Sequence, residues 1–290
     1  MKNIKKFAAF ALVLAMLAAA LSGCGIKGPH EIRVGGMKDP TTIGMVKLLK
    51  DSELGRSDVK VDFTLTGAAD ELAPKVIKGE VDLAAVPANL ASVLWNKTGG
   101  EVVLLAVNTL GVLYIVETGN DIQSIADLKG KTIYASGKGS TPEYNLRFIL
   151  SQNGIDPDKD VTIEWKSEAS ETVAMLATGG GVAMVPQPYV ASAQAKIENL
   201  RIALDLTREW ENLGVSSKMI TGVLVGRRDF VMANPGAVDE FLDEYEDSIE
   251  YVNEHVSEAA AIVGEYGIVG AQVAEKAIPI AIWNTSTKRK

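Results

Sequence analysis

Apolar and polar positions alternate along the chain with two different periods. Strand-like runs are separated by stretches whose apolar residues recur every three or four positions, the spacing of an amphipathic helix. The strand-like runs lie at residues 31–35, 59–65, 83–86, 102–107, 113–117, 131–135, 161–165, 182–185 and 223–226. The helical stretches lie at residues 41–50, 71–78, 122–127, 141–153, 170–178, 190–198 and 234–256, the last with Asn234 as its expected N-cap. This alternation predicts an α/β fold with mainly parallel sheets covered by helices on both faces.

The first 24 residues have the pattern of an export signal. Three lysines precede an apolar run from Phe7 to Leu21, and the sequence Leu21-Ser22-Gly23-Cys24 follows. A basic start, an apolar segment of about 15 residues and small residues before a cleavage site are typical of a secretory signal peptide. The last four residues resemble the lipobox of bacterial lipoproteins, which predicts removal of residues 1–23 and acylation of Cys24 by fatty acids such as palmitate. The alternative is an ordinary cleaved signal with a cysteine nearby.

Composition and charge narrow the class of partner. The chain has 29 Lys and Arg against 37 Asp and Glu, a net charge of -8, and loss of the three lysines in residues 1–23 would give -8 - 3 = -11. An acidic protein gains nothing from a phosphate backbone, so we expect no nucleic-acid partner. No later stretch reaches 18 apolar residues, so membrane contact is expected only through the anchor. Acylation of Cys24, the single cysteine, would leave none for a disulfide.

Two segments of the chain resemble each other. Residues 76–89 and 174–188 each contain a helix end, a glycine stop, a short apolar strand and a Val-Pro pair. Either repeated βα units simply look alike, or two lobes of related design each aim one such loop at a shared cleft. Ligands gather at the carboxyl ends of parallel strands. Asn89 and Gln187, which follow the two Val-Pro pairs, are therefore candidate ligand contacts.

Two further strand-to-helix turns place hydroxyl groups beside glycines. Residues 35–42 include Thr41 and Thr42, and residues 136–143 include Ser140 and Thr141. The N–H groups at helix N-termini attract anions and polar groups, which makes these four residues candidate ligand contacts. Plain helix capping is the alternative, and Ser140 has the capping-box spacing to a glutamate three residues later.

Three weaker candidates complete the expected ligand site. Leu110 and Gly111 follow a strand near the first crossover between lobes, and Tyr189 follows the second Val-Pro loop. An aromatic ring at that position could pack on a flat ligand, although aromatic residues are more often part of a core. Lys38 and Lys138 stand near two of the loops and are expected to be solvated.

The motifs of common catalytic and metal sites are missing from the sequence. His30 falls in the expected tether and His255 near the end of an acidic helix, so neither a Ser-His-Asp site nor zinc ligation is supported. Gly130-Lys131-Thr132 resembles the end of a P-loop, but Ile125 stands where that motif requires glycine. A dinucleotide fingerprint fails because its third glycine is replaced by Pro142. We therefore expect no catalytic residue, no cofactor and no metal.

Four stretches of the chain carry a resemblance to a known family: Gly79–Ala84, Ser124–Ile133, Gln187-Pro188 and Phe230–Pro235. In this order they resemble the solute-binding proteins of bacterial ABC importers, in the branch handling nitrate, sulfonates, taurine and thiamine-pyrimidine precursors. The resemblance implies a type II periplasmic-binding-protein fold, with two Rossmann-like α/β lobes joined by two crossover segments. Lobe 1 would comprise residues 31–112 and 218–290, lobe 2 residues 113–217, and residues 24–30 would form a tether.

The same resemblance implies a monomeric, lipid-anchored extracytoplasmic protein that delivers a small organic or anionic ligand to an ABC permease. An enzyme of pyrimidine or menaquinone synthesis on the same fold is an alternative, against which the export signal argues. A surface sensor is another alternative.

Two departures from the family pattern stand out. Gly-Gly-Gly-Val-Ala-Met replaces the usual Gly-x-Val-Asp and predicts a looser turn, and the abrupt end from Ala277 to Lys290 suggests a truncated or frame-shifted gene.

Overall fold

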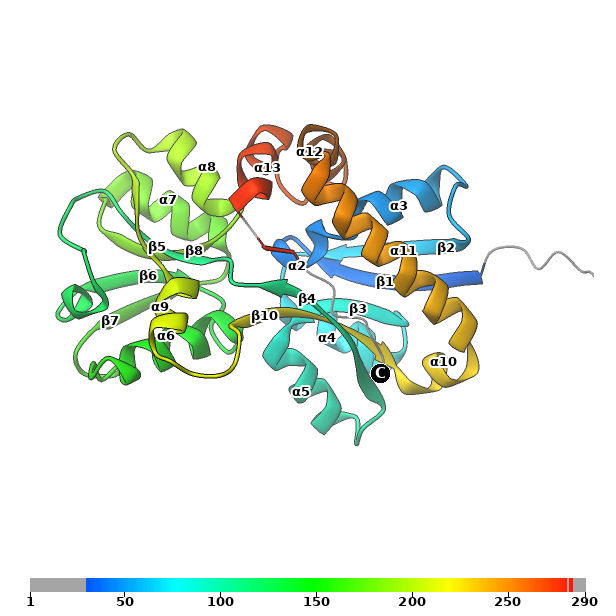
Figure 1. Cartoon of the computed structure of the whole chain (residues 1–290). Helices are drawn as coiled ribbons and strands as arrows, with labels where there is room; N and C mark the ends of the chain where they lie inside the picture. The colour runs from blue at the N-terminus through cyan, green and yellow to red at the C-terminus, as the bar shows by residue number, and fades with distance from the viewer. Residues whose placement is uncertain (1–29, 281, 284–290) are drawn as a thin grey trace, which may run out of the picture. The chain divides into compact units, whose positions relative to one another are not determined.

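The computed structural model describes residues 30–280 and 282–283 (Figure 1). The described residues from Glu31 onward form one compact unit. The expected signal peptide and Cys24 lie outside the described residues. Strand β1 begins at His30, the last residue of the expected tether. None of the helices in the described ranges combines the length and the apolar character that a membrane span requires.

The described strands form two sheets, and the strand order in each shows how the chain passes between them. The first sheet has the order β11-β4-β10-β3-β1-β2, with β1 (His30–Met37), β2 (Val59–Thr66), β3 (Leu83–Pro87), β4 (Val102–Leu110), β10 (Ile220–Arg227) and β11 (Ile282–Trp283). The second has the order β7-β6-β8-β5-β9, with β5 (Leu113–Glu117), β6 (Thr132–Ser136), β7 (Thr162–Lys166), β8 (Val182–Pro186) and β9 (Arg201–Asp205). The chain leaves the first sheet after β4 and returns to it at β10.

The α/β fold class is confirmed, but both sheets are mixed rather than mainly parallel. The pairs β1/β3, β6/β7 and β6/β8 are parallel, as helical crossovers require. Strand β10 runs antiparallel to both β3 and β4, and β5 runs antiparallel to both β8 and β9. These two strands follow the passages between the sheets, so they enter from the opposite end. The local βα pattern of the sequence does not predict in which direction these two strands run.

Helices connect most of the strands and cover the two sheets (Figure 1). Those that precede the return to the first sheet are α2 (Pro40–Ile43), α3 (Val46–Glu53), α4 (Ala69–Lys78), α5 (Ala88–Lys97), α6 (Thr141–Gln152), α7 (Ala169–Gly179), α8 (Tyr189–Lys196) and α9 (Leu206–Asn212). The later ones are α10 (Arg228–Ala233), α11 (Pro235–Glu254), α12 (Val256–Glu265) and α13 (Ala271–Ala277). Two short 3₁₀ segments, η1 (Ile125–Leu128) and η2 (Ile278–Ile280), complete the described set.

Alternate residues of the central strands enter different apolar clusters, because neighbouring side chains of a strand point to opposite faces. In β3, Leu83 and Ala85 pack with residues of α3, α11 and α12, whereas Ala84 and Val86 pack with α4 and α5. In the second sheet, β5 and β8 divide their residues in the same way between α6 with η1 on one face and α7 with α8 on the other. Helices therefore cover both faces of each sheet, as predicted.

Several elements differ from the pattern prediction. The helix expected over residues 41–50 is interrupted between α2 and α3 at Gly44 and Met45. Asn234 is the N-cap residue of α11, but its amide donates to the carbonyl oxygen of Phe230 at 3.0 Å and so caps the preceding helix. The elements α5, β9, α9, α10, α12 and α13 were not predicted. Most of them are short or partly exposed, which weakens their periodic signal.

The two similar segments of the sequence occupy equivalent places, each as a helix, a glycine turn, a buried strand and a further helix. In the first, Asp82 accepts hydrogen bonds from the backbone N–H and the side-chain Nε of Arg33, at 3.0 and 2.9 Å. In the second, where alanine replaces this aspartate, the turn is tied to Thr118, whose hydroxyl accepts from the Gly181 N–H at 2.9 Å. The two turns are thus held by different hydrogen bonds.

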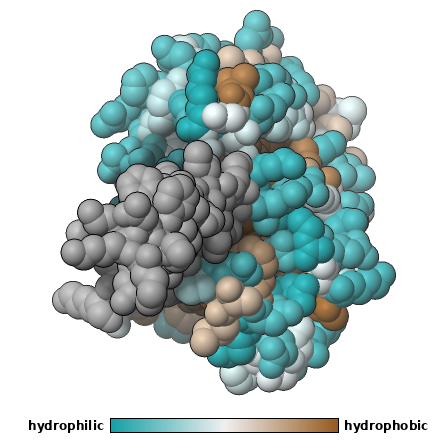
Figure 2. Space-filling view, turned by 90° about the vertical axis from the view of Figure 1, so that its right-hand side faces the viewer, coloured by the Kyte–Doolittle hydropathy of each residue, from teal (hydrophilic) through white to brown (hydrophobic). Residues whose placement is uncertain are grey.

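The face shown in Figure 2 is dominated by hydrophilic residues, with hydrophobic ones in small separate groups outside the grey area. Helix α11 follows the same division, because Asp239, Glu240 and Asp243 are exposed while Phe241 and Tyr245 are buried. The acidic residues of this helix therefore lie on its solvent-facing side.

Candidate functional site

Loops from the ends of strands in both sheets line a cleft of about 490 Å³. The first sheet contributes the segment after β1, the end of β3 at Pro87, Thr109 of β4 and Thr221 of β10. The second contributes the start of β5, the segments after β6 and β7, and the end of β8 at Pro186. The carboxyl ends of β1, β3, β6 and β8 thus meet at one cleft, where ligands of α/β proteins usually bind.

The segment from Met37 to Thr42 forms one wall. Asp39 is the N-cap of α2, and its Oδ1 accepts from the Thr41 N–H at 2.8 Å and from the Thr41 hydroxyl at 2.5 Å. Thr41 lines the cleft. Thr42 does not, because its hydroxyl donates to the Met37 carbonyl and accepts from the Met37 N–H, at 2.7 and 2.8 Å. The first threonine faces the cleft and the second fixes the turn behind it.

The opposite wall is the glycine-rich segment before α6. Ser140 lines the cleft, and its hydroxyl donates to the Gly137 carbonyl at 2.8 Å instead of capping α6. Glu143 accepts from the Gly139 N–H at 2.7 Å, one residue before the N-cap. The expected capping box is therefore wrong, because Gly137 and Gly139 have φ values of +84° and +74° and fold the turn back on itself.

Asn89 of α5 and Thr141 of α6 bind each other and so connect a helix on the first sheet to a helix on the second. The Asn89 N–H donates to the Thr141 hydroxyl oxygen at 3.1 Å, and that hydroxyl donates to Asn89 Oδ1 at 3.1 Å. The Asn89 amide also donates to the Gly139 carbonyl at 2.9 Å. Neither residue lines the cleft. The Asn89 side chain and the Thr141 hydroxyl form hydrogen bonds with each other instead of facing the cleft.

Tyr189 lines the cleft and makes a second contact between elements of the two sheets. Its hydroxyl, at the start of α8, donates to the carbonyl oxygen of Lys38 at 3.1 Å. Burial raises the pKa of Tyr189 to about 12, and the negative charges of Asp39 and Glu168 add to the rise. Tyr189 therefore stays protonated at neutral pH and acts as a hydrogen-bond donor.

The remaining three sequence candidates lie outside the cleft lining. Gln187 is fully buried; its Oε1 accepts from the Ala191 N–H at 3.3 Å, and its Nε2 has no partner among the described residues. Leu110 and Gly111 lie where the chain leaves β4. Gly111 has a φ of +24°, and a Cβ there would lie 2.0 Å from the hydroxyl of Thr207. Thr41, Ser140 and Tyr189 are thus the candidates that line the cleft, and ligand contact by all nine remains a prediction.

Sequence reasoning did not select Asp39 as a candidate, although it belongs to the glycine-containing turn that was singled out. Burial raises the pKa of Asp39 to about 6, while the two hydrogen bonds from Thr41 act in the opposite direction. Thr109 belongs to the same strand end as the candidates Leu110 and Gly111, and it lines the cleft where they do not. Thr221 also lines the cleft, and its strand shows no motif that would select it. Lys38 and Lys138 line its edge and are exposed, as expected.

Replacing Asp39 with asparagine should stabilise the ligand-free protein at pH 8 by about 1–2 kcal/mol, after allowance for partial exposure. A carboxyl group with a raised folded-state pKa binds its proton more tightly when folded. The wild type therefore loses stability relative to this variant as the pH rises from about 4 to about 6. Urea unfolding of both proteins between pH 4 and 8 measures the difference. A difference independent of pH would contradict this account, because asparagine caps helices as well as aspartate.

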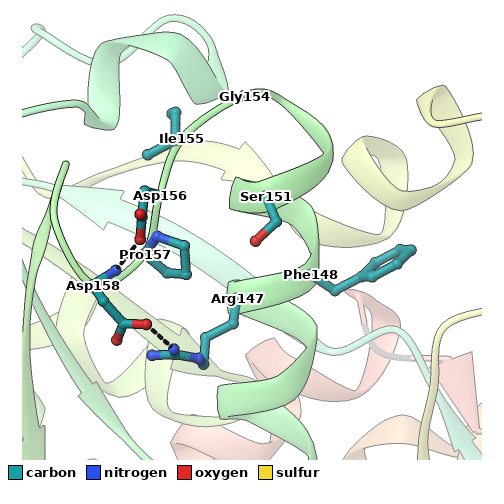
Figure 3. Close-up of a pocket in the computed structure, with 8 residues that line it drawn as sticks. All are labelled: Arg147, Phe148, Ser151, Gly154, Ile155, Asp156, Pro157 and Asp158. Carbon is teal, nitrogen blue, oxygen red and sulfur yellow. Dashed lines mark hydrogen bonds and ion pairs between the residues drawn. The ribbon is translucent and has the colours of Figure 1, made fainter.

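A second hollow of about 490 Å³ lies on the surface beside the end of α6 (Figure 3). It is formed by residues 147–158, within one helix and the turn that follows it. The Arg147 guanidinium of α6 donates to the Asp158 carboxylate of the turn at 2.6 Å (Figure 3). No second element contributes, so we assign no ligand to this hollow.

Among the residues that the structure describes, no group of three or more His, Cys, Asp or Glu is placed to hold a metal ion.

Solved structures share this fold. The periplasmic aliphatic sulphonate binding protein SsuA from Escherichia coli matches with a TM-score of 0.71 over 89% of this chain and 86% of its own, at 18% identity. The alkanesulfonate-binding protein SsuA from Xanthomonas axonopodis pv. citri, bound to MOPS, matches at 0.65 over 88% and 86%, at 19% identity. The periplasmic nitrate-binding protein NrtA from Synechocystis PCC 6803 matches at 0.61 over 84% and 69%, at 15% identity. At such identities the likeness shows the type II periplasmic-binding-protein fold.

Family membership follows from the sequence itself. Comparison with curated protein sequences finds no match. Residues 57–259 of the 290 match the family described as NMT1/THI5 like. The matched range runs from the segment before β2 into α12, so it includes cleft residues from both sheets. The chain belongs to the NMT1/THI5-like family.

Proposed function

We propose that this protein is the solute-binding component of an ABC importer, and that it captures a small molecule in the cleft and delivers it to a permease. The observation that carries the proposal is the cleft itself. It has the volume of a small-ligand site and is lined by strand ends from both sheets. The family match and the likeness to sulfonate- and nitrate-binding proteins support this function. A binding role without turnover is part of the proposal.

The proposed mechanism is closure of two lobes around the ligand. Lobe 1 would comprise residues 31–112 and 218–290, and lobe 2 residues 113–217. The chain passes between the sheets twice, from β4 to β5 and from α9 to β10, and these passages would form the hinge. A ligand that contacts both walls stabilises the closed state and shifts the equilibrium toward it. The hydrogen bonds of Asn89 with Thr141 and of Tyr189 with Lys38 would form on closure.

The proposed location is the outer face of the cell membrane. Cleavage before Cys24 and acylation of its sulfur would anchor the protein, because two acyl chains hold a protein stably whereas one binds marginally. Residues 24–30 would then act as the tether, and the protein would be a monomer beside its permease. Mass spectrometry of the membrane-extracted protein should show an acylated N-terminal cysteine. An unmodified Cys24 in the mature protein would remove this part of the proposal.

Replacing Asn89 with alanine should weaken ligand binding about 5- to 30-fold, because it removes hydrogen bonds that favour the closed state, at about 1–2 kcal/mol in total. Isothermal titration of ligand-stripped protein against sulfonates, nitrate, pyrimidines, aromatic acids and alkyl amines identifies a ligand and measures the change. Asn96→Ala is the matched control, since this residue of the same helix donates to the Ser92 carbonyl within α5.

Three results would decide the matter. Saturable one-to-one binding that weakens in Asn89→Ala and not in Asn96→Ala supports closure. Recovery of the bound compound unchanged after long incubation, checked by mass spectrometry, supports transport over turnover. Failure of every compound to bind or to raise the melting temperature would reject the proposed function.

A further inference from the structure

The charged side chains that line the cleft differ in exposure and pairing. Five of the seven are exposed to solvent: Lys38, Asp70, Lys97, Lys138 and Glu168. Lys166 is half-buried and bound to the Glu164 carboxylate at 3.2 Å. Asp39 is also half-buried, but it forms no salt bridge with any residue that the structure describes. The wall of the cleft thus contains one partly desolvated negative charge with no cation opposite it.

The two oxygens of Asp39 are used unequally. Oδ1 accepts both hydrogen bonds from Thr41. Within the described residues no donor reaches Oδ2. A desolvated carboxylate oxygen without a donor is unfavourable, and burial indeed shifts the pKa of this group upward to about 6. Tyr189 lies close enough for its own pKa to respond to the charge, yet its hydroxyl donates to Lys38 and not to Asp39.

Much of the cleft wall is apolar. Leu90 and Leu94 of α5, Ile77 of α4 and Leu113 of β5 line the same cleft. We propose that Asp39 is the counter-ion of the ligand, and that the cleft selects an organic ammonium ion with an apolar body. The inference rests on the proposed solute-binding function and specifies the chemical class of the solute. An ammonium group would supply the missing donors and the missing charge, while the body would cover the apolar wall.

The titration of Asp39 predicts how the affinity for a cation changes with pH. Well above pH 6 the carboxylate is ionised and attracts a cation. Below pH 6 a proton must leave before the cation can bind, so affinity should fall about tenfold per pH unit. An anion would show the opposite trend, because it binds best when Asp39 is protonated. The other charged side chains that line the cleft are Lys38, Asp70, Lys97, Lys138, Lys166 and Glu168, and Tyr189 lines it as well.

The test compares three probes that share one apolar body: hexylamine, 1-hexanol and hexane-1-sulfonate. An alkylammonium, like a lysine side chain, stays protonated over this whole pH range. At pH 8 we expect hexylamine to bind at least tenfold more tightly than hexanol, with the preference declining below about pH 6. Asp39→Asn should abolish the preference and its pH dependence. Glu198→Gln, which neutralises an exposed carboxylate outside the cleft lining, should change either one less than twofold.

Each outcome bears on the inference. Tighter binding of the sulfonate at pH 8, or an amine preference that survives in Asp39→Asn, would overturn it. If other compounds saturate the cleft but hexylamine does not, the inference fails while the solute-binding function stands. If no compound binds, both fail. Circular dichroism of Asp39→Asn confirms that the variant is folded, as the isosteric side chain predicts.

Discussion

Replacing Arg201 with alanine is expected to lower the free energy of unfolding by about 3–5 kcal/mol. The reason is Glu117, whose side chain is 2% exposed and forms a salt bridge with the Arg201 guanidinium. The glutamate also accepts from the N–H groups of Asp121 and Ile122, at 3.2 and 3.1 Å, and Arg201 donates to the Gly119 carbonyl at 3.3 Å. Without the arginine, the buried carboxylate loses its salt-bridge partner, and the loop loses its cross-link.

Urea unfolding of three proteins tests this. Arg147→Ala is the matched control, since the Arg147–Asp158 pair is exposed and should contribute at most about 1 kcal/mol (Figure 3). The double variant Arg201→Ala with Glu117→Gln should recover part of the loss, because a neutral amide is easier to bury than an unpaired charge. Equal, small losses in the two arginine variants would show that the buried pair contributes no more than a surface one.

Gly222→Val should destabilise the protein by about 3 kcal/mol and abolish ligand binding. A Cβ at this position in β10 would lie 2.6 Å from both Asn108 Oδ1 and Thr41 Cγ2, and 2.8 Å from Thr109 Oγ1. These side chains are buried and cannot simply rotate away. The Asn108 amide donates to the Thr41 carbonyl at 3.2 Å, and the Thr109 hydroxyl donates to Asn108 at 3.0 Å. Displacing them breaks a hydrogen-bond network directly beneath two cleft residues.

Gly236→Ala is the control, and its expected effect on stability is opposite to that of Gly222→Val. Gly236 lies in the first turn of α11, and nothing lies within 4 Å of the Cβ that an alanine would add. Alanine favours helix, so this variant should be more stable by about 0.5 kcal/mol and should bind ligand as the wild type does. Thermal unfolding and titration with the ligand found for the wild type measure both effects. A Gly222→Val protein that still binds with wild-type affinity would show that this network does not support the cleft.

Much of the architecture was readable from the sequence, because it depends on local patterns. Strand β2 and helix α6 follow from period-two and period-3.6 spacing within single segments, and glycine stops such as Gly79 and Gly154 mark turns with positive φ. The two Val-Pro pairs correctly marked strand ends at one cleft, since Pro87 and Pro186 both line it. Short amphipathic elements such as α9 and α13 carry too few turns for the same signal to identify them.

The chemistry of the cleft was decided by the tertiary structure. Thr41 and Thr42 are equivalent in sequence, yet one lines the cleft and the other bonds to Met37 behind it. Asn89 and Thr141 lie far apart in the chain and bind each other, which no local pattern shows.

The sequence by itself determined the alternating α/β elements, the acidic surface and the class of loops that form the cleft, because each depends on residues near one another in the chain. The fold decided the antiparallel entry of β5 and β10, the burial of Glu117 and the unpaired charge of Asp39. Burial and pairing depend on which distant segments meet, and that is fixed only when the two sheets are assembled.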